Sequence, residues 1–231
     1  ISICFIISIY RMKKKLSVFG CTGSIGETTF KLLKNNKQFK FYILTGFKNY
    51  KKIKYLIRYY KPKYFVIFDD KTFLKIKKEF DKKKVIILNS KDFYSFKFEK
   101  SDVTILAIPG MAGLEPSLEI IKKSKKILIA NKESVICGWN LINKIAKKYK
   151  VKILPVDSEH FSIMNLINET HNKFIEKIYL TASGGPFLNY PLKKMSKIKP
   201  SQAINHPKWK MGKKISIDSA TLMNKLFEVI E

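Results

Sequence analysis

The chain has 231 residues, 45% of them hydrophobic, which is long enough to bury a core and typical of a soluble globular protein. Its formal net charge of +28 can indicate a nucleic-acid partner, but every basic residue except Arg11 and Arg58 is a lysine, and proteins that bind nucleic acid favour the planar donor fork of arginine. The three cysteines form no C-x-x-C pair, and their odd number argues against a disulfide framework or a thiolate zinc site and fits a cytoplasmic location.

Both ends of the chain have unusual features. Residues 1–10 are apolar, but a membrane span needs roughly 20 residues and a signal peptide needs a basic start. We therefore expect a translated stretch upstream of a start at Met12 and no membrane partner, with a short membrane-associated leader as the alternative. The chain opens on Ile1 and stops at Glu231 inside a predicted helix, so we expect a C-terminally truncated fragment.

Short apolar runs alternate with lysine-rich amphipathic segments after Lys15. The apolar runs predict strands at 16–20, 39–44, 64–68, 85–88, 103–108, 127–130 and 151–155. Helices are predicted between most of them, for example at 28–35, 51–60, 114–123 and 141–150. This alternation predicts βαβ units, a mainly parallel sheet and an α/β fold. The character of the sequence changes near Pro155, where we expect a second domain to begin.

A glycine-rich run, GCTGSIG at 20–26, joins the first predicted strand to the helix that follows. Glycine allows a tight turn and lets the backbone approach a pyrophosphate, whose charge is stabilised at a helix N-terminus. The spacing G-x-x-G-x-x-G differs from the commoner G-x-G-x-x-G, and glycine also marks ordinary turns. The position of the run inside a βαβ unit favours a dinucleotide site.

The end of the second predicted strand indicates which dinucleotide is bound. A site selective for NAD usually has Asp or Glu roughly 20 residues after the glycines, where it holds the ribose hydroxyls. Here the sequence reads LTGFKN at 44–49, without an acid. Lys48 is suited to the 2′-phosphate of NADPH, although it is also one lysine among many.

Two polar runs follow later strands, at the sheet edge where open α/β folds bind ligands. The first is NKES at 131–134, for which helix capping by Asn131 is the alternative role. The second is PVDSEH at 155–160. In extended backbone Asp157 and Glu159 point the same way and converge on one hard cation, Mg²⁺ or Mn²⁺, with Ser158 on the other side. A helix start at Ser158 is the alternative.

Two further segments carry groups suited to a phosphate and a metal. A strand predicted from Leu180 leads into the glycine turn of TASGGPF at 181–187, whose backbone N–H groups can cup a phosphate. A strand is also predicted at 215–218. A predicted helix at 221–231 puts Asn224 and Glu228 on one face, with Lys225 three residues before Glu228, so a surface ion pair is the plain alternative for those two.

The motifs GCTGSIG, ANKES, PVDSEH, TASGGPF, HPKWKMGKK and SIDSATLMNKLFE resemble the 1-deoxy-D-xylulose 5-phosphate reductoisomerase family in order and spacing, from Lys14 to Glu231. The resemblance implies NADPH-dependent rearrangement and reduction of 1-deoxy-D-xylulose 5-phosphate to 2-C-methyl-D-erythritol 4-phosphate, in the non-mevalonate route to isoprenoids. It implies a Rossmann-like domain at 12–155 and part of an α+β catalytic domain at 156–231, with the C-terminal helical domain absent and a homodimer in the full-length protein. We therefore expect little activity from the fragment alone.

The resemblance also implies roles for particular residues. The implied NADPH contacts are Thr22, Gly23, Ser24, Ile25, Lys48, Asn49, Asn131, Glu133 and Gly212. The implied metal ligands are Asp157, Glu159 and Glu228. The implied substrate contacts are Lys132, Ser158, Glu159, Ser183, His206, Ser219, Asn224, Lys225 and Glu228. The implied catalytic residues are Lys132, Asp157, Glu159, His206 and Glu228. The segment around Trp209 and Met211 resembles a flap, and Leu226-Phe227 stands where the family usually has Gly-Leu.

Two other classes of function stay open at this point. Another two-domain NADPH oxidoreductase, such as a homoserine or aspartate-semialdehyde dehydrogenase-like protein, would share the glycine loop but would not need the carboxylates. A basic nucleic-acid-binding module would predict a salt-dependent DNA affinity and no cofactor. We attribute the lysines instead to coding bias in an A/T-rich genome, and we expect a small sugar phosphate as substrate and no nucleic-acid partner.

Overall fold

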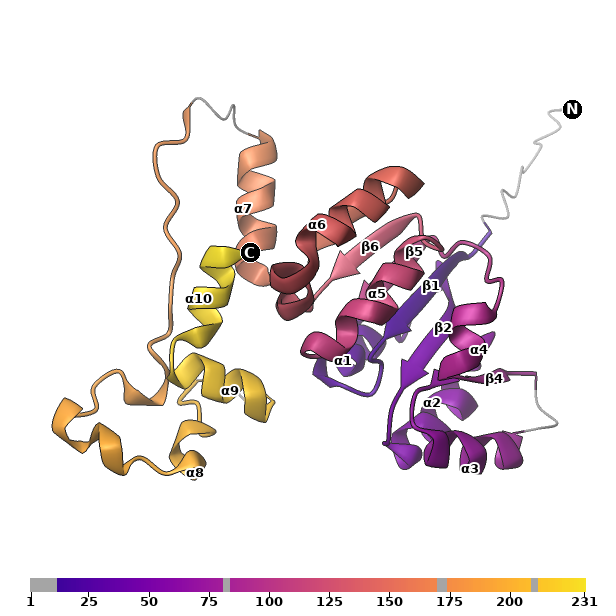
Figure 1. The fold of residues 1–231 in the computed structure, drawn as a ribbon, viewed down its shortest axis with the longest axis horizontal. Helices are drawn as coiled ribbons and strands as arrows, with labels where there is room; N and C mark the ends of the chain where they lie inside the picture. The colour runs from indigo at the N-terminus through magenta and orange to yellow at the C-terminus, as the bar shows by residue number, and fades with distance from the viewer. Residues whose placement is uncertain (1–11, 81–83, 170–173, 209–211) are drawn as a thin grey trace, which may run out of the picture.

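A computed structural model describes residues 12–80, 84–169, 174–208 and 212–231. Seven parallel strands form one sheet in the order β4-β3-β2-β1-β5-β6-β7 (Figure 1). Their bounds are β1 Lys14–Phe19, β2 Phe39–Gly46, β3 Tyr64–Ile67, β4 Ile86–Asn89, β5 Val103–Leu106, β6 Lys126–Ile129 and β7 Lys152–Pro155. The predicted parallel α/β sheet is confirmed, and the strand ends lie within two residues of the prediction.

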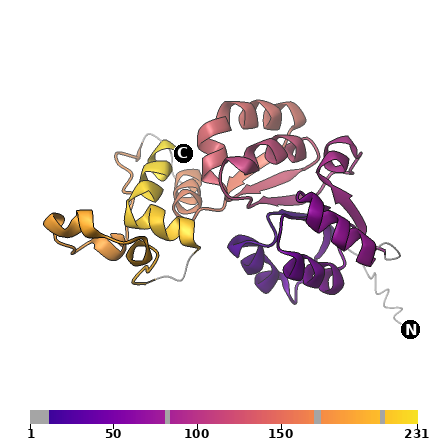
Figure 2. The same ribbon diagram turned by 60° about the horizontal axis from the view of Figure 1, so that its bottom comes forward.

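Helices cover both faces of this sheet (Figures 1 and 2). Val18 and Phe19 are neighbours on β1 and both are fully buried, but they belong to different apolar clusters because successive side chains of a strand point to opposite faces. The cluster of Val18 includes residues of α1 Ser24–Leu33, α2 Tyr50–Tyr60 and α3 Asp70–Phe80. The cluster of Phe19 includes residues of α4 Ser90–Ser95, α5 Leu114–Ile121 and α6 Lys132–Tyr149.

The sheet order reverses beside β1, and this reversal positions the site. The chain builds outward from β1 to β4 and then returns to place β5 on the other side of β1. The connections after β1 and β5 therefore leave in opposite directions, and open α/β sheets bind ligands at such a switch point. The 3-10 turn Met111–Gly113 lies in the connection that follows β5.

Two helices begin earlier than predicted, because polar residues that follow the preceding strands already belong to the helices. The side chain of Asn131 accepts a hydrogen bond from the Ser134 backbone N–H at 3.0 Å and caps α6, which begins at Lys132 and not near residue 141. Similarly, α1 begins at Ser24, directly after Gly23. The capping role that we considered for Asn131 is therefore the observed one.

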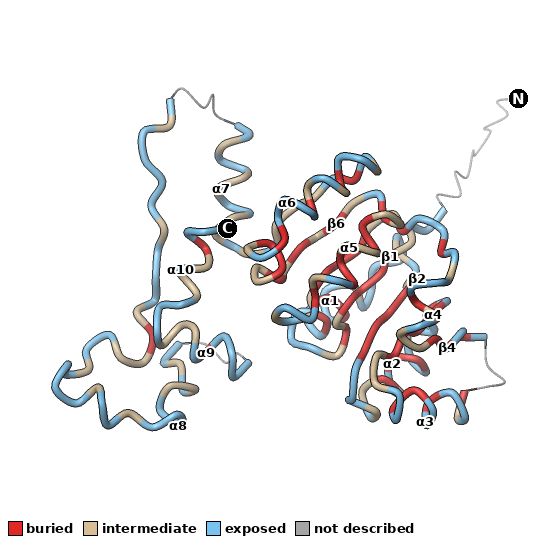
Figure 3. Tube along the Cα trace, viewed as in Figure 1, coloured by how far each residue is buried: buried red, intermediate tan, exposed pale blue. Residues whose placement is uncertain are grey.

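The described residues after β7 are helical or irregular and extend away from the sheet (Figure 1). Its elements are α7 Ser158–Glu169, the 3-10 turns η3 Gly185–Phe187 and η4 Leu192–Lys197, and α8 Pro200–Ala203, α9 Lys213–Ala220 and α10 Met223–Ile230. Most described residues in this part are exposed or half-buried (Figure 3), and α7 contains no buried residue. The last helix, α10, returns to contact α6.

Two predicted strands in this part were wrong. Residues 180–183 are irregular, and residues 215–218 lie inside α9. Their apolar and β-branched residues produced the prediction, but a strand is stable only when its backbone pairs with another strand. Among the described residues, every named strand belongs to the seven-stranded sheet, and neither segment is part of it. No helix in the described part of the chain is long and apolar enough to cross a membrane.

Candidate active site

The glycines of the first loop have different structural roles. Gly20 has a φ of +78°, and a β-carbon there would overlap the backbone of Ala107 on the neighbouring strand connection. A β-carbon on Gly26 would overlap the backbone of Cys21. Gly23, the N-cap of α1, has only one atom near its β-carbon position, at 3.4 Å. The first and third glycines thus shape the loop, while the middle one leaves open space beside the first N–H groups of α1, which have no partner within the helix.

A cavity of about 470 Å³ lies beside this loop, at the carboxyl ends of β1, β5, β6 and β7. Residues 23–25 line it on the α1 side, and residues 130–133 line it after β6. The segment after β7 adds Asp157 and Glu159, and the last two helices with their approach add residues 212–215, Asn224 and Glu228. The cavity therefore joins the glycine loop to side chains from the second half of the chain.

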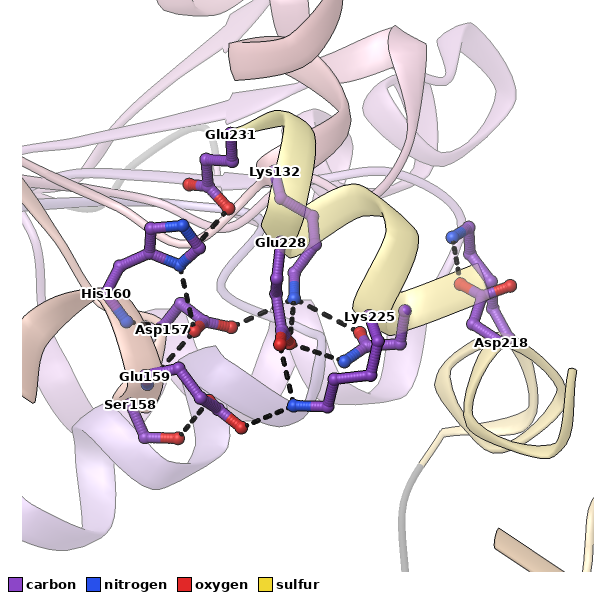
Figure 4. A network of polar contacts seen from close by, with 11 residues as sticks. Lys132, Asp157, Ser158, Glu159, His160, Asp218, Lys225, Glu228 and Glu231 are labelled. Atoms are coloured by element: carbon purple, nitrogen blue, oxygen red, sulfur yellow. Dashed lines mark hydrogen bonds and ion pairs between the residues drawn. The ribbon is translucent and has the colours of Figure 1, made fainter. Parts of the chain in front are cut away.

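Three carboxylates meet at one end of this cavity. Asp157, Glu159 and Glu228 each offer an oxygen atom, and these oxygens lie within 4.8 Å of one another. They come from the N-terminal end of α7 and from α10, about 70 residues apart in sequence. The predicted convergence of Asp157 with Glu159 and Glu228 is therefore present in the structure (Figure 4).

The ammonium group of Lys132 lies between two of these carboxylates (Figure 4). Its Nζ donates to Asp157 Oδ2 at 2.9 Å, to Glu228 Oε1 at 2.8 Å and to Asn224 Oδ1 at 3.1 Å. Only 14% of the Lys132 side chain is exposed, and 1% of the Glu228 side chain. Buried charges of this kind are stable only when they are paired and hydrogen-bonded, which is the case here.

Lys225 bridges the remaining carboxylate to the same cluster. Its Nζ donates to Glu159 Oε1 at 2.7 Å and to Glu228 Oε2 at 2.6 Å. Asn224, one residue earlier on α10, donates to Glu228 Oε1 at 2.5 Å. The pair Lys225–Glu228 is therefore part of a site with residues from α7, and not the isolated surface pair that the sequence left open.

The two lysines determine the charge state of the carboxylates. Burial alone would raise the pKa of the Asp157 carboxyl, but the hydrogen bond and charge of Lys132 outweigh it and hold that pKa at about 2. Burial opposes ionisation of Glu159 as well, and the hydrogen bond from Lys225 outweighs it and lowers the pKa. Burial alone would lower the pKa of Lys132 and Lys225, but their carboxylate partners outweigh it, so the pKa of both lysines is raised. Asp157, Glu159, Lys132 and Lys225 are therefore charged near neutral pH.

The backbone around Asp157 is not the extended strand that we expected. Asp157 Oδ1 accepts hydrogen bonds from the N–H groups of Glu159, at 3.1 Å, and His160, at 3.4 Å, so Asp157 caps α7. The helix start that we kept as the alternative is the observed one. Asp157 and Glu159 converge because both lie in the first turn, not because strand side chains alternate. The Ser158 hydroxyl donates to Glu159 Oε2 at 2.7 Å.

A second ion-pair cluster connects the two halves of the chain across the cavity. Lys214 Nζ lies 2.6 Å from Glu133 Oε1 on α6 and 2.6 Å from Asp218 Oδ2 on α9. Gly212, two residues before Lys214, also lines the cavity. Nothing in the sequence distinguishes Lys214 from the other lysines, and its role is visible only in the fold.

The predicted phosphate-binding residues form a separate group. Ser183 Oγ lies 3.0 Å from His206 Nε2. Gly184 and Gly185 form the predicted turn with φ values of +76° and +62°, and a β-carbon on Gly185 would lie 3.0 Å from the Ser219 carbonyl oxygen. The structure thus brings Ser183, His206 and the end of α9 together, outside the cavity lining. The predicted flap residues, Trp209 and Met211, lie outside the described residues.

Some predicted cofactor residues also lie outside the cavity lining. The Lys48 ammonium lies 5.0 Å from the centre of the Phe47 ring, and Asn49 caps α2 by accepting from the Lys52 N–H at 3.2 Å. Lys52 Nζ donates to the carbonyl of Thr22 in the glycine loop at 2.8 Å. Lys52, which also forms an ion pair with Glu27, thus lies beside the loop, and the sequence did not reveal this position.

The chain matches two family models. The model for 1-deoxy-D-xylulose 5-phosphate reductoisomerase matches residues 16–138, and the model for the C-terminal domain of that family matches residues 153–231. The reductoisomerase of Pelagibacter ubique is 50% identical over 222 residues, which are 94% of this chain and 57% of the relative. The reductoisomerase of Clostridium novyi is 44% identical over 94% of this chain and 58% of the relative. The chain thus spans a little over half the length of these curated relatives.

Solved structures give the same result. A DOX-P reductoisomerase in complex with NADPH, fosmidomycin and magnesium matches with a TM-score of 0.83 and 34% identity, over 94% of this chain and 57% of that chain. The 1-deoxy-D-xylulose 5-phosphate reductoisomerase from Zymomonas mobilis in complex with NADPH matches with a TM-score of 0.82 and 34% identity, with the same coverage.

Proposed function

This chain belongs to the 1-deoxy-D-xylulose 5-phosphate reductoisomerase family, and on that premise we propose that it forms the cofactor-binding and metal-binding part of an enzyme that converts 1-deoxy-D-xylulose 5-phosphate to 2-C-methyl-D-erythritol 4-phosphate with NADPH. The observation that carries this proposal is the cavity that the glycine loop shares with Asp157, Glu159 and Glu228. The reaction, the substrate and the isoprenoid pathway are proposals for the whole protein, because the chain spans 57% of the Pelagibacter relative.

The residues at the carboxylate end fit a hard divalent cation. Asp157, Glu159 and Glu228 offer only carboxylate oxygens, which Mg²⁺ and Mn²⁺ prefer. Such a cation, when bound, supplies a Lewis acid that stabilises negative charge developing on substrate oxygens. Asp157 is positioned for this task by its place at the start of α7, and Glu228 by the two lysines that hold its carboxylate.

The residues at the glycine loop fit a dinucleotide phosphate. Gly23 leaves space beside the N-terminus of α1, where backbone N–H groups and the helix dipole stabilise a negative charge. The exposed Lys48 after β2 adds positive charge suited to a 2′-phosphate, which supports NADPH over NADH. NADPH, when bound, supplies the hydride for the reduction. The remaining proposed contacts are Thr22, Ser24, Ile25, Asn49, Asn131, Glu133 and Gly212.

The proposed substrate contacts have donors suited to a sugar phosphate. Lys132, Lys225 and Asn224 would orient its hydroxyl and carbonyl oxygens near the carboxylates. The Ser183 hydroxyl and the His206 imidazole are suited to a phosphate, with Ser158 and Ser219 as further hydroxyl donors. Contacts to a phosphate remote from the reacting carbons supply binding energy that can be used to position those carbons. Lys132, Asp157, Glu159, His206 and Glu228 are the proposed catalytic residues.

The alternative functions fit these observations less well. A homoserine or aspartate-semialdehyde dehydrogenase-like reaction leaves the carboxylate cluster without a role, and a nucleic-acid-binding module leaves the cavity without one. We also propose a homodimer and a cytoplasmic location for the whole protein. Light scattering on the purified protein tests the dimer.

The experiment uses the chain joined at Glu231 to the remaining C-terminal residues of the Pelagibacter relative. We expect NADPH oxidation on addition of 1-deoxy-D-xylulose 5-phosphate with Mn²⁺, and loss of activity with EDTA. Replacing the metal ligand in Glu159→Gln should lower turnover at least about 100-fold and leave NADPH affinity nearly unchanged. The control Glu176→Gln removes an 85% exposed carboxylate and should leave turnover unchanged. Oxidation that persists in EDTA would contradict the metal assignment.

A further inference from the structure

Every oxygen of the three clustered carboxylates has a hydrogen-bond partner within the chain. Asp157 Oδ1 accepts from the first turn of α7, and its Oδ2 accepts from Lys132. Glu159 Oε1 accepts from Lys225, and its Oε2 accepts from Ser158. Glu228 Oε1 accepts from Lys132 and Asn224, and its Oε2 accepts from Lys225. A divalent cation that binds these oxygens therefore competes with donors of the chain, above all with the Lys132 ammonium, which contacts two of the three carboxylates.

The Lys132 ammonium is surrounded by acceptor oxygens, as a bound metal cation would be. Its three N–H donors match three acceptors, on Asp157, Glu228 and Asn224, at 2.8–3.1 Å. These donors use the group completely, and the side chain is largely buried. Lys132 thus satisfies two of the three carboxylates at the point where they converge.

The helix cap limits how the cluster can rearrange. Asp157 Oδ1 is held by backbone N–H groups of α7, and moving it would leave a helix terminus unsatisfied. The oxygen of Asp157 that can turn to a metal is therefore Oδ2, which binds Lys132. Ligands of Mg²⁺ at about 2.1 Å in octahedral geometry lie about 3 Å apart. The carboxylate oxygens, which here lie up to 4.8 Å apart, must close in, and the ammonium stands in the way.

We propose that Lys132 is an internal cation that holds Asp157 and Glu228 together in the metal-free chain, and that a divalent cation binds by displacing its ammonium group. This inference rests on the proposed function for the identity of the metal ligands. Lys132 Nζ lies between Asp157 Oδ2 and Glu228 Oε1, which are oxygens that a shared divalent cation would bind, so the two cations compete for the same position.

The displaced ammonium gains a second role. Lys132 is the first residue of α6 and lines the cavity, so its released Nζ stays beside Asn224 and the open space. It can then donate to an oxygen of the substrate. Metal binding thus releases a cation for the substrate, and the two ligands bind cooperatively.

The first test measures Mn²⁺ affinity by electron paramagnetic resonance, which needs no substrate and no activity. Lys132→Met removes the competing ammonium, and we expect this variant to bind Mn²⁺ at least about tenfold more tightly than the wild-type chain does. The free energy of a tenfold change in affinity is only a small part of the interaction energy between two charges about 4 Å apart. Lys213→Met is the matched control, because Lys213 is exposed on the lining of the same cavity and no ion pair is found for it in the described residues. It should change the affinity much less.

The outcomes separate this inference from the proposed function. Weaker or unchanged Mn²⁺ binding by Lys132→Met overturns the displacement, while Mn²⁺ binding by the wild type keeps the metal site. If neither the wild type nor either variant binds Mn²⁺, both the displacement and the metal site are overturned. If Lys132→Met does not fold, a crystal structure of the wild-type chain with Mn²⁺ decides. We expect Lys132 Nζ to lie more than about 4 Å from Asp157 Oδ2, beyond ion-pair distance. Bound Mn²⁺ with the Lys132 contacts intact would refute the proposal.

Discussion

Gly26 packs so closely against Cys21 that a β-carbon on Gly26 would overlap the Cys21 carbonyl group. Gly26→Ala should therefore shift α1 or the loop and lower the free energy of unfolding by about 1–3 kcal/mol, the usual cost of overpacking. Alanine otherwise favours a helix interior, so the direction of the change separates the contact from helix propensity. Urea unfolding of the purified chain measures it, and an unchanged or raised stability would exclude the close contact.

Gly23→Ala is the matched variant in the same loop. Gly23 has a φ of −85° and one atom, at 3.4 Å, near its β-carbon position, so alanine fits without strain. We expect stability within about 0.5 kcal/mol of the wild type, but NADPH affinity about tenfold lower, because the methyl group fills the space for the pyrophosphate. Fluorescence titration with NADPH measures the affinity. Equal NADPH affinity in Gly23→Ala and wild type would mean that the pyrophosphate does not approach this glycine.

Lys48 should contribute to the choice between cofactors. It is exposed after β2, in a position where the chain offers no acid for the ribose hydroxyls. We expect Lys48→Gln to weaken NADPH binding roughly fivefold, the value of one exposed charge pair, and to leave NADH binding unchanged. Lys51→Gln, which removes a nearby exposed lysine, controls for the overall charge. A parallel loss of affinity for both cofactors in Lys48→Gln would rule out contact with the 2′-phosphate.

The Asp102 carboxyl, which lies away from the active site, should make the stability of the chain depend on pH. Burial alone would raise the pKa of its carboxyl, but hydrogen bonds from Lys125, at 2.7 Å, and the Lys15 backbone N–H, at 2.8 Å, outweigh it and lower the pKa below 3.8. The folded chain therefore binds fewer protons than the unfolded chain, and the stabilisation is complete above pH 3.8 and lost as the pH falls through the lower, folded pKa.

We expect Asp102→Asn to be less stable than the wild type by about 1–2 kcal/mol at pH 7, and the difference to shrink below about pH 4. Urea unfolding at several pH values measures it, at pH values where the chain stays folded. Lys125→Met should reduce the pH dependence without removing it, because the Lys15 backbone N–H remains. A stability difference that grows toward low pH would have the wrong sign and would contradict the pairing.

The parallel sheet could be predicted from sequence because buried strands and amphipathic helices carry their signal in local periodicity. The strands predicted at 180–183 and 215–218 failed because strand formation depends on a pairing partner, which local periodicity does not report. Asn131 and Asp157 were recognised as polar residues after strands, but their helix-capping roles depend on the backbone that follows. Lys52 and Lys214 could not be distinguished from other lysines until the fold placed them beside the glycine loop and Glu133.

We propose that Asp157, Glu159 and Glu228 together bind one divalent cation. Titration of the chain with Mn²⁺, followed by electron paramagnetic resonance, tests it most directly. We predict one bound Mn²⁺ per chain, displaced by Mg²⁺, and at least about tenfold weaker binding in Asp157→Asn, Glu159→Gln and Glu228→Gln, since each variant removes a charged ligand. Wild-type affinity in the Glu228→Gln variant would contradict the account, because a metal site without Glu228 would not join α10 to the start of α7.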